Sequence, residues 1–119
     1  MITITDNKID EPRFVNDNGT YYGVLKGIKK GENSSGKAFV RFTFETDDGL
    51  ISFKCYSGKL VFGYISTITG LFCKGAINEI TDDDCKTIRD YAVDARFQIE
   101  IRDNKSNARY HSYYVTRMK

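Results

Sequence analysis

The chain has 119 residues and a mass of 13.6 kDa, which suits one hydrophobic core and is too little for two, so we expect one domain over residues 1–119. Its composition, 40% hydrophobic and 29% charged, excludes a disordered or fibrous protein. The sequence has no apolar run long enough for a membrane span, and its acidic N-terminal stretch is not a signal peptide. We therefore expect no membrane contact and a cytoplasmic location.

The net charge of +2 is distributed unevenly along the chain. Residues 20–60 contain seven Lys and Arg against four Asp and Glu, whereas residues 82–103 contain four against seven. Residues 104–119 contain four basic residues and no acidic one. Any basic surface must therefore be local, and residues 20–60 are one place to expect it.

The cysteines are three in number, widely spaced, and form no C-x-x-C motif; they are Cys55, Cys73 and Cys85. His111 is the only histidine. The number and spacing of these residues predict reduced, buried thiols and neither a disulfide framework nor a zinc site.

The first half of the chain reads as strands separated by turn residues, the pattern of an all-β protein. We predict strands at Thr20–Lys30, Lys37–Thr46 and Leu50–Ser57, with Asp47–Gly49 as a hairpin turn between the last two.

The register of that hairpin follows from its alternating apolar residues. If Phe44 lies opposite Ile51, every apolar residue of one strand meets an apolar residue of the other, and a slip of one residue would destroy the match. The inner pairs are then Phe44 with Ile51, Phe42 with Phe53 and Val40 with Cys55. The outer pairs are Phe39 with Tyr56, Arg41 with Lys54 and Thr43 with Ser52.

The segment Gly58–Gly70 has apolar residues at helical spacing, which predicts a short helix, although Gly63 and the β-branched residues lower helix propensity. We predict a fourth strand at Leu71–Thr81, with Gly75 as a bulge. The acidic stretch Asp82–Asp90 is predicted to be a loop or a single helical turn.

Alternation predicts a fifth strand at Tyr91–Arg102, with Val93 among its inner residues, and a last strand at Arg109–Thr116 after the turn Asp103–Ala108. This order of elements is that of an OB-fold: five principal strands, a short helix between the third and the fourth, and β extensions at both termini. We therefore expect an all-β, OB-fold-like five-stranded Greek-key barrel.

The sequence offers no catalytic constellation, so we do not expect an enzyme. His111 lies amid Arg109 and tyrosines, with no acidic residue after Asp103. The acidic triplet Asp82–Asp84 lacks the spacing of a calcium loop, and residues 26–37 lack the motif of a phosphate-binding loop. We therefore expect no metal and no cofactor.

Residues 26–37 and the outer face of the hairpin favour nucleic-acid binding instead. Four lysines flank a Gly- and Ser-rich loop and can follow phosphates, while two rings and two cations on the outer face can hold bases and backbone. In an OB-fold the loop between the first two strands is one of the ligand-binding loops, and the face of strands two and three is the binding platform. The predicted site consists of Lys26, Lys29, Lys30, Lys37, Phe39, Arg41, Lys54 and Tyr56.

Two alternatives stay open from the residues alone. The rings of Phe39 and Tyr56 can equally be a structural pair, covered by the N-terminal segment or by another subunit. The Tyr-rich stretch at residues 108–119 either extends the groove or forms a subunit interface.

The opening YYGVLKGIKKGENSSGKAFVRFTFETDDG at residues 21–49, the order of elements and the small size resemble phage-encoded OB-fold single-stranded DNA-binding proteins, particularly those of lactococcal phages. The resemblance implies sequence-independent coating of single-stranded DNA during phage DNA replication and recombination in the infected host cell. It also implies homo-oligomers and contacts with host or phage recombination proteins. The chain ends in YYVTRMK, and not in the acidic tail by which bacterial proteins of this function recruit partners. The alternative function is a phage structural or assembly protein whose aromatic face is a protein interface.

Overall fold

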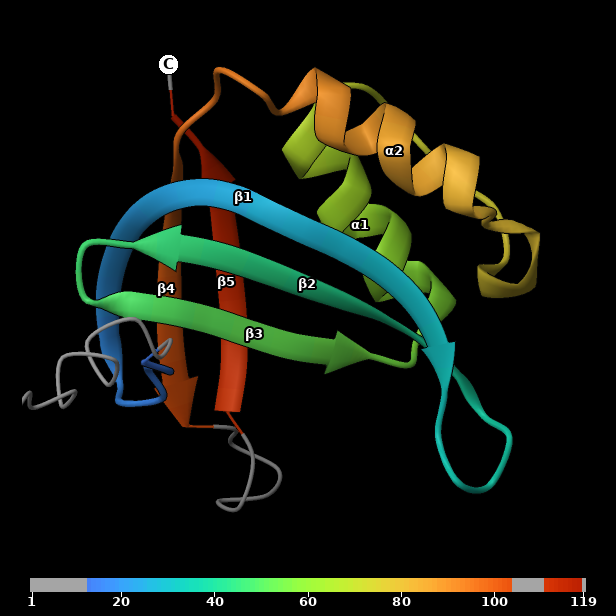
Figure 1. The fold of residues 1–119 in the computed structure, drawn as a ribbon, viewed down its shortest axis with the longest axis horizontal. Helices are drawn as coiled ribbons and strands as arrows, with labels where there is room; N and C mark the ends of the chain where they lie inside the picture. Colours follow the sequence, from blue (N-terminus) through green and yellow to red (C-terminus); the bar gives the residue numbers. More distant parts are fainter. Residues whose placement is uncertain (1–12, 104–110, 119) are drawn as a thin grey trace, which may run out of the picture.

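The computed structural model of the protein describes residues 13–103 and 111–118 (Figure 1). Its strands form one antiparallel sheet in the order β3-β2-β1-β4-β5, and its helices lie between β3 and β4 in the chain. The strands are β1 Gly19–Glu32, β2 Ala38–Thr46, β3 Gly49–Cys55, β4 Phe97–Asp103 and β5 His111–Arg117. The helices are α1 Gly58–Thr69, the short 3-10 helix η2 Ile77–Glu79 and α2 Asp82–Tyr91.

β1 bends strongly, and this bend brings the two ends of the sheet toward each other (Figure 1). Its first part, as far as Gly23, pairs with β4, and the part from Gly23 onward pairs with β2. A Cβ atom at Gly23 would lie 2.0 Å from the carbonyl oxygen of Glu45, so only glycine allows this close approach. A register shift between Leu25 and Gly27 places Lys26 in a bulge, and bulges bend the strand that carries them.

The core lies inside the curled sheet, and phenylalanine rings are its largest fully buried side chains. Phe42 and Phe44 of β2 are fully buried, as is Phe97 of β4. The rings of Phe44 and Phe97 contact edge to face at 5.6 Å, although β1 separates their strands in the sheet. The predicted hairpin register is confirmed: Phe44 pairs with Ile51, Phe42 with Phe53, Val40 with Cys55, Arg41 with Lys54 and Thr43 with Ser52.

The predicted helix after β3 is confirmed as α1. Ser57 caps its first turn by accepting a hydrogen bond from the amide of Leu60, and Gly70 ends it at a φ of 74°. Its buried face includes Val61, Ile65 and Ile68, which close one end of the curled sheet. Neither α1 nor α2 has the length and apolar character needed to cross a bilayer.

The predicted strand at Leu71–Thr81 is wrong, because these residues form irregular chain and η2. The Ser66 hydroxyl accepts from the Cys73 amide and the Thr69 hydroxyl accepts from the Leu71 amide, so α1 side chains bond two amides at the start of this segment in place of a strand ladder.

The acidic stretch after this segment is the ten-residue helix α2, longer than the loop or single turn predicted for it. Thr81 and Asp84 form a reciprocal capping box, and three aspartates occupy the first turn, where the helix dipole favours negative charge. Cys85 and Ile88, three residues apart, are its buried side chains.

The helix also shortens the predicted strand at Tyr91–Arg102, since β4 begins only at Phe97. Val93, predicted to point inward, lies in the connection before β4 and is 74% exposed. The predicted last strand is present as β5, while Arg109 and Tyr110 lie outside the described residues.

Candidate nucleic-acid interface

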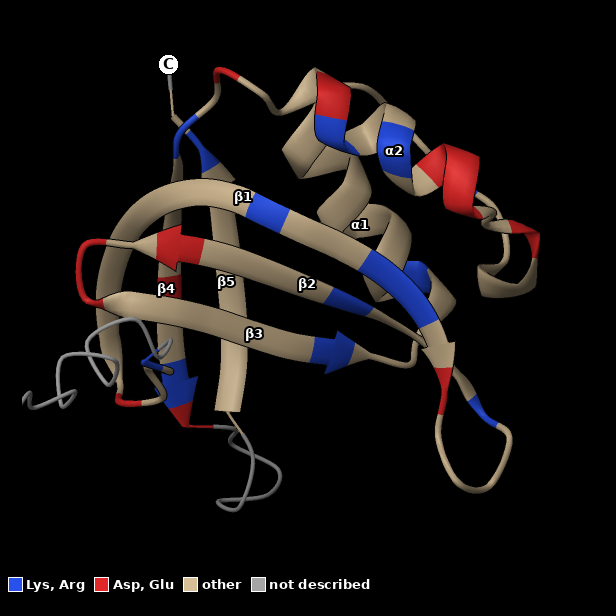
Figure 2. Ribbon diagram, in the orientation of Figure 1, with Lys and Arg blue, Asp and Glu red and all other residues tan. Residues whose placement is uncertain are grey.

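Three basic side chains lie opposite one another across β1, β2 and β3 on the outer face of the sheet. Lys29 pairs in register with Arg41, and Arg41 with Lys54. We call Lys29, Arg41 and Lys54 the cationic rung; Figure 2 shows basic segments side by side on these strands. Within residues 13–103 and 111–118, no carboxylate forms an ion pair with any of them. Like charges placed opposite each other destabilise a sheet, so a bound anion would stabilise this one.

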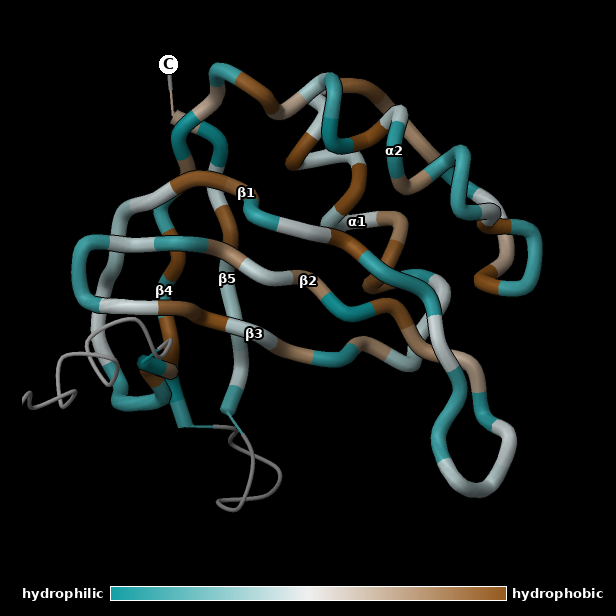
Figure 3. Tube along the Cα trace, in the orientation of Figure 1, coloured by the Kyte–Doolittle hydropathy of each residue, from teal (hydrophilic) through white to brown (hydrophobic). Residues whose placement is uncertain are grey.

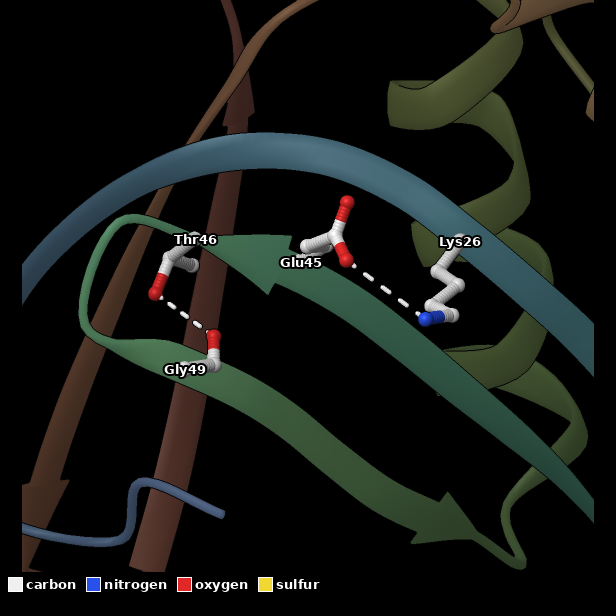
Figure 4. Close-up of polar contacts among 4 residues, drawn as sticks. All are labelled: Lys26, Glu45, Thr46 and Gly49. Carbon is white, nitrogen blue, oxygen red and sulfur yellow. Dashed lines mark hydrogen bonds and ion pairs between the residues drawn. The ribbon is translucent and has the colours of Figure 1, made fainter. Parts of the chain in front are cut away.

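Lys26 and Lys30, two other predicted site residues, interact with groups of their own chain. The Nζ atom of Lys26 lies 3.5 Å from a carboxylate oxygen of Glu45, next to the turn that Thr46 closes by donating to the Gly49 carbonyl (Figure 4). This ion pair is exposed and therefore weak. Lys30 points to the other side of β1 and donates to the carbonyl oxygens of Asn78 and Ile80, at 3.1 and 3.2 Å.

Phe39 and Tyr56 contact each other as predicted, with ring centroids 5.5 Å apart in an edge-to-face arrangement. Phe39 is only 9% exposed: its ring covers Gly31 of β1, where a Cβ atom would lie 2.9 Å from the ring, and the Nζ atom of Lys54 lies 4.7 Å from the ring centroid. The ring is covered by residues of the sheet itself and has little open surface for a base.

Tyr56, by contrast, is only partly buried and lies at the junction of two hollows. The Nζ atom of Lys37 lies 5.4 Å from its ring centroid. One hollow has Lys37, Tyr56 and Gly58 on its walls. The other is a cavity of about 440 Å³ between β3 and β5. Tyr56 therefore connects the lysine of the β1–β2 loop to the cationic rung.

The cavity between β3 and β5 contains residues that the predicted site does not include. Tyr113 of β5 stacks on Phe53 of β3 with centroids 4.3 Å apart, and its hydroxyl donates to the side-chain oxygen of Asn16. The Nδ1 atom of His111 is buried without a hydrogen-bond partner among the described residues, and lies 3.9 Å from a carboxylate oxygen of Asp103. The cavity is lined by Arg41, Ser52, Lys54 and Tyr56 together with Asn16, Phe53, His111 and Tyr113.

Some of the residues that line this cavity could be expected from the sequence. The Tyr-rich stretch at residues 108–119 was one expected extension of the groove, and it supplies His111 and Tyr113. Ser52 was predicted to be an outer residue of its strand, without a role in the site. Asn16 had no signal, because its position depends on how the chain before β1 pairs along the edge of β3.

Burial favours the neutral forms of two tyrosines and one cysteine around the site. Burial raises the pKa of Tyr113 and raises that of Tyr64 to about 12, and it also raises the pKa of the Cys55 thiol. The phenols therefore remain hydrogen-bond donors at neutral pH. In the part of the chain that the structure describes, no three His, Cys, Asp or Glu side chains gather as metal ligands would.

No protein-family model, curated protein or solved structure matches the chain.

Proposed function

We propose that the protein binds single-stranded DNA without sequence preference, as an OB-fold protein of phage DNA replication and recombination. The observation that carries the proposal is the cationic rung, three basic side chains opposite one another with no carboxylate partner among the described residues. The phage setting rests on the resemblance of the sequence.

The order of strands supports the OB-fold part of the proposal. A sheet ordered β3-β2-β1-β4-β5 becomes a five-stranded barrel when its edge strands β3 and β5 meet. The stacked rings of Phe53 and Tyr113 bring side chains of these two strands together, and α1 follows β3 as the helix of an OB-fold does.

The proposed path of the bound DNA crosses β1, β2 and β3 and ends at the cavity beside β5. Lys29, Arg41 and Lys54 bind phosphates, while the rings of Tyr56 and Tyr113 stack on bases. Phosphate contacts carry no sequence information, and every base has a face on which a ring can stack, so this division predicts binding that tolerates any sequence.

The alternative function, a phage structural or assembly protein, requires a sizeable apolar surface on the aromatic face. Phe39 is buried there, and Lys37, Arg41 and Lys54 surround Tyr56. This composition suits a polyanion better than an apolar protein surface, so we do not propose that function.

Fluorescence titration with oligo-dT at several salt concentrations tests the proposal. Three phosphate contacts predict that log K falls with log salt with a slope of about −2, at about −0.7 per contact on single strands. No binding at low salt, or binding that salt does not change, would contradict the proposal. Double-stranded DNA and single-stranded RNA, titrated in parallel, report the preference among nucleic acids.

An abasic oligonucleotide of the same length is the matched control for stacking. It keeps the phosphates and removes the bases, so we expect the same salt slope and an affinity at least tenfold lower, since each stacked base contributes about 1–3 kcal/mol. Equal affinity for both oligonucleotides would leave phosphate binding in place and refute the role of Tyr56 and Tyr113.

A further inference from the structure

His111, at the start of β5, is a titratable residue at the end of the proposed DNA path to which the proposed function gives no role. It pairs in register with Asp103, and the ends of β4 and β5 that meet there are hydrophilic (Figure 3). Its side chain lines the cavity that contains Arg41 and Lys54. It also lines a second, smaller cavity of about 280 Å³, which Tyr64 of α1 borders. His111 is therefore in position to contact a group that enters from the cationic rung.

The two ring nitrogens of His111 have different surroundings. Nδ1 is buried and lies 3.9 Å from a carboxylate oxygen of Asp103. The side chain is 28% exposed, and this exposure belongs to the rest of the ring, which includes Nε2. A hydrogen on Nδ1 faces the carboxylate favourably, whereas a lone pair there would face negative charge, so Asp103 favours the tautomer with hydrogen on Nδ1. In that neutral tautomer Nε2 is a hydrogen-bond acceptor and repels a phosphate oxygen.

We propose that His111 is a further DNA-binding residue, which takes up a proton when a phosphate of the bound DNA enters the cavity. Protonation turns Nε2 into a donor and adds a positive charge to those of Arg41 and Lys54, so the ring becomes a ligand for phosphate. Asp103 lines neither cavity, so its carboxylate holds the Nδ1 side of the ring without facing the phosphate. This inference rests on the proposed function, because it adds a residue to the same site.

The charged groups around His111 act on its protonation in opposite directions. Arg41 and Lys54 oppose it in the free protein, whereas Asp103 and a bound phosphate favour it. The phosphate also weakens the opposition of the two cations by pairing with them. Binding of DNA and binding of the proton should therefore favour each other.

The other titratable side chains on the two cavities keep their charge over the same pH range. Burial raises the pKa of three of them, which therefore stay neutral below pH 8: Cys55, Tyr64 and Tyr113. The remaining two on the described walls are Tyr56 and Tyr114. Among all these side chains, histidine is the type that ordinarily changes charge between pH 5 and 8. DNA binding should therefore depend on pH through His111.

NMR titration of the untagged protein tests the proton uptake directly, because His111 is the only histidine of the chain. We expect its ring to titrate at higher pH with oligo-dT bound than without it, since a bound phosphate favours the imidazolium. Thymine has no group that titrates between pH 5 and 8, and a 5′-hydroxyl end avoids a terminal phosphate that would. A titration that oligo-dT leaves unchanged or moves to lower pH would overturn the proposal.

Fluorescence titration with the same oligo-dT at pH 5.5 and pH 8 measures the consequence for binding. The affinity at low salt should be roughly tenfold higher at pH 5.5, because one more charge-assisted hydrogen bond forms. The slope of log K against log salt should be steeper there by about 0.7, the value of one phosphate contact. His111→Gln should show the parent's pH 8 slope at both pH values. His111→Lys, which is charged at both, should show the steeper slope at both.

Asp103→Asn tests the positioning role of the carboxylate. Asp94→Asn is its matched control, since Asp94 is an exposed aspartate in the connection before β4. Asp103→Asn should move the rise in affinity to lower pH, and Asp94→Asn should follow the parent.

Three outcomes of these titrations would overturn the inference. They are a parent protein that binds with the same affinity and salt slope at both pH values, a His111→Gln protein with the parent's pH dependence, and equal shifts in the two Asn variants. In each of them salt-dependent binding remains and the proposed function stands. Absence of binding at both pH values would instead overturn the proposed function, and this inference with it, so the two failures are distinguishable.

Discussion

Lys29 and Lys30 are neighbours in β1, yet their ammonium groups have opposite surroundings. Lys30 reaches across the inner side of the strand to two carbonyl oxygens of the chain before α2. Lys29, on the outer side, pairs in register with another cation, Arg41. The difference teaches that a cluster of lysines in a sequence contains two populations, one that holds the fold together and one that carries charge available to a ligand.

The same distinction applies to the two rings at the end of the hairpin. Phe39 is packed between Gly31 and Lys54, while Tyr56 keeps part of its surface and borders two hollows. On this basis Tyr56 belongs with Lys29, Arg41 and Lys54 as a residue available to a ligand, and Phe39 belongs with Lys30 as a residue of the fold.

The largest expected effect comes from removing two members of the cationic rung together. Arg41→Ala with Lys54→Ala should weaken binding of oligo-dT at low salt by roughly one to two orders of magnitude, because two charge-assisted phosphate contacts disappear. The slope of log K against log salt should become shallower by about 1.4, at about 0.7 per contact. Fluorescence titration at four or more salt concentrations measures both quantities.

The matched control for this double variant is Lys86→Ala with Arg89→Ala, which removes the same charge from α2. If binding depends on the rung, the control should keep the parent's salt slope. Equal losses in the two double variants would mean that net charge governs binding and that the rung has no special role.

The second prediction separates the two rings. Phe39→Ala should lower the free energy of unfolding by about 1.5–3 kcal/mol, the value of one buried apolar side chain. Tyr56→Ala should change the unfolding free energy by less and should reduce the preference for oligo-dT over an abasic strand. Urea denaturation and paired titrations measure these effects. A Phe39→Ala protein as stable as the parent, or a Tyr56→Ala protein with the full preference, would contradict the distinction.

Much of the hairpin was predictable because apolar and polar residues alternate in both of its strands, and this alternation restricts how the two strands can pair. Apolar residues at every second position of β2 and β3 allow only one register, and that register places Arg41 opposite Lys54. Leu71–Thr81 misled the prediction because hydroxyl groups on α1 bond the amides of Leu71 and Cys73 at its start, and such contacts between segments leave no periodic pattern in the sequence.

The candidate site was predictable only in part, for a related reason. Alternation from buried Ile28 places Lys30 inward and Lys29 outward, so the sequence contained the signal that separates them. His111 and Tyr113 reach the cavity beside β3 only because β1 bends, and the bend depends on a bulge and on a glycine packed against the Glu45 carbonyl. No local pattern encodes that bend.

The smallest expected effect returns to the two neighbouring lysines. Lys30→Met keeps the aliphatic stem but leaves the carbonyl oxygens of Asn78 and Ile80 without their donor, so the free energy of unfolding should fall by about 1 kcal/mol. Lys29→Met removes the same charge one residue earlier and should leave stability within about 0.5 kcal/mol of the parent, as is usual for surface changes. In oligo-dT titrations Lys29→Met should have the larger effect of the two. It should make the slope of log K against log salt shallower by about 0.7, whereas Lys30→Met should leave the slope unchanged. Two variants that lose stability and salt dependence to the same extent would show that the two sides of β1 do not divide these tasks.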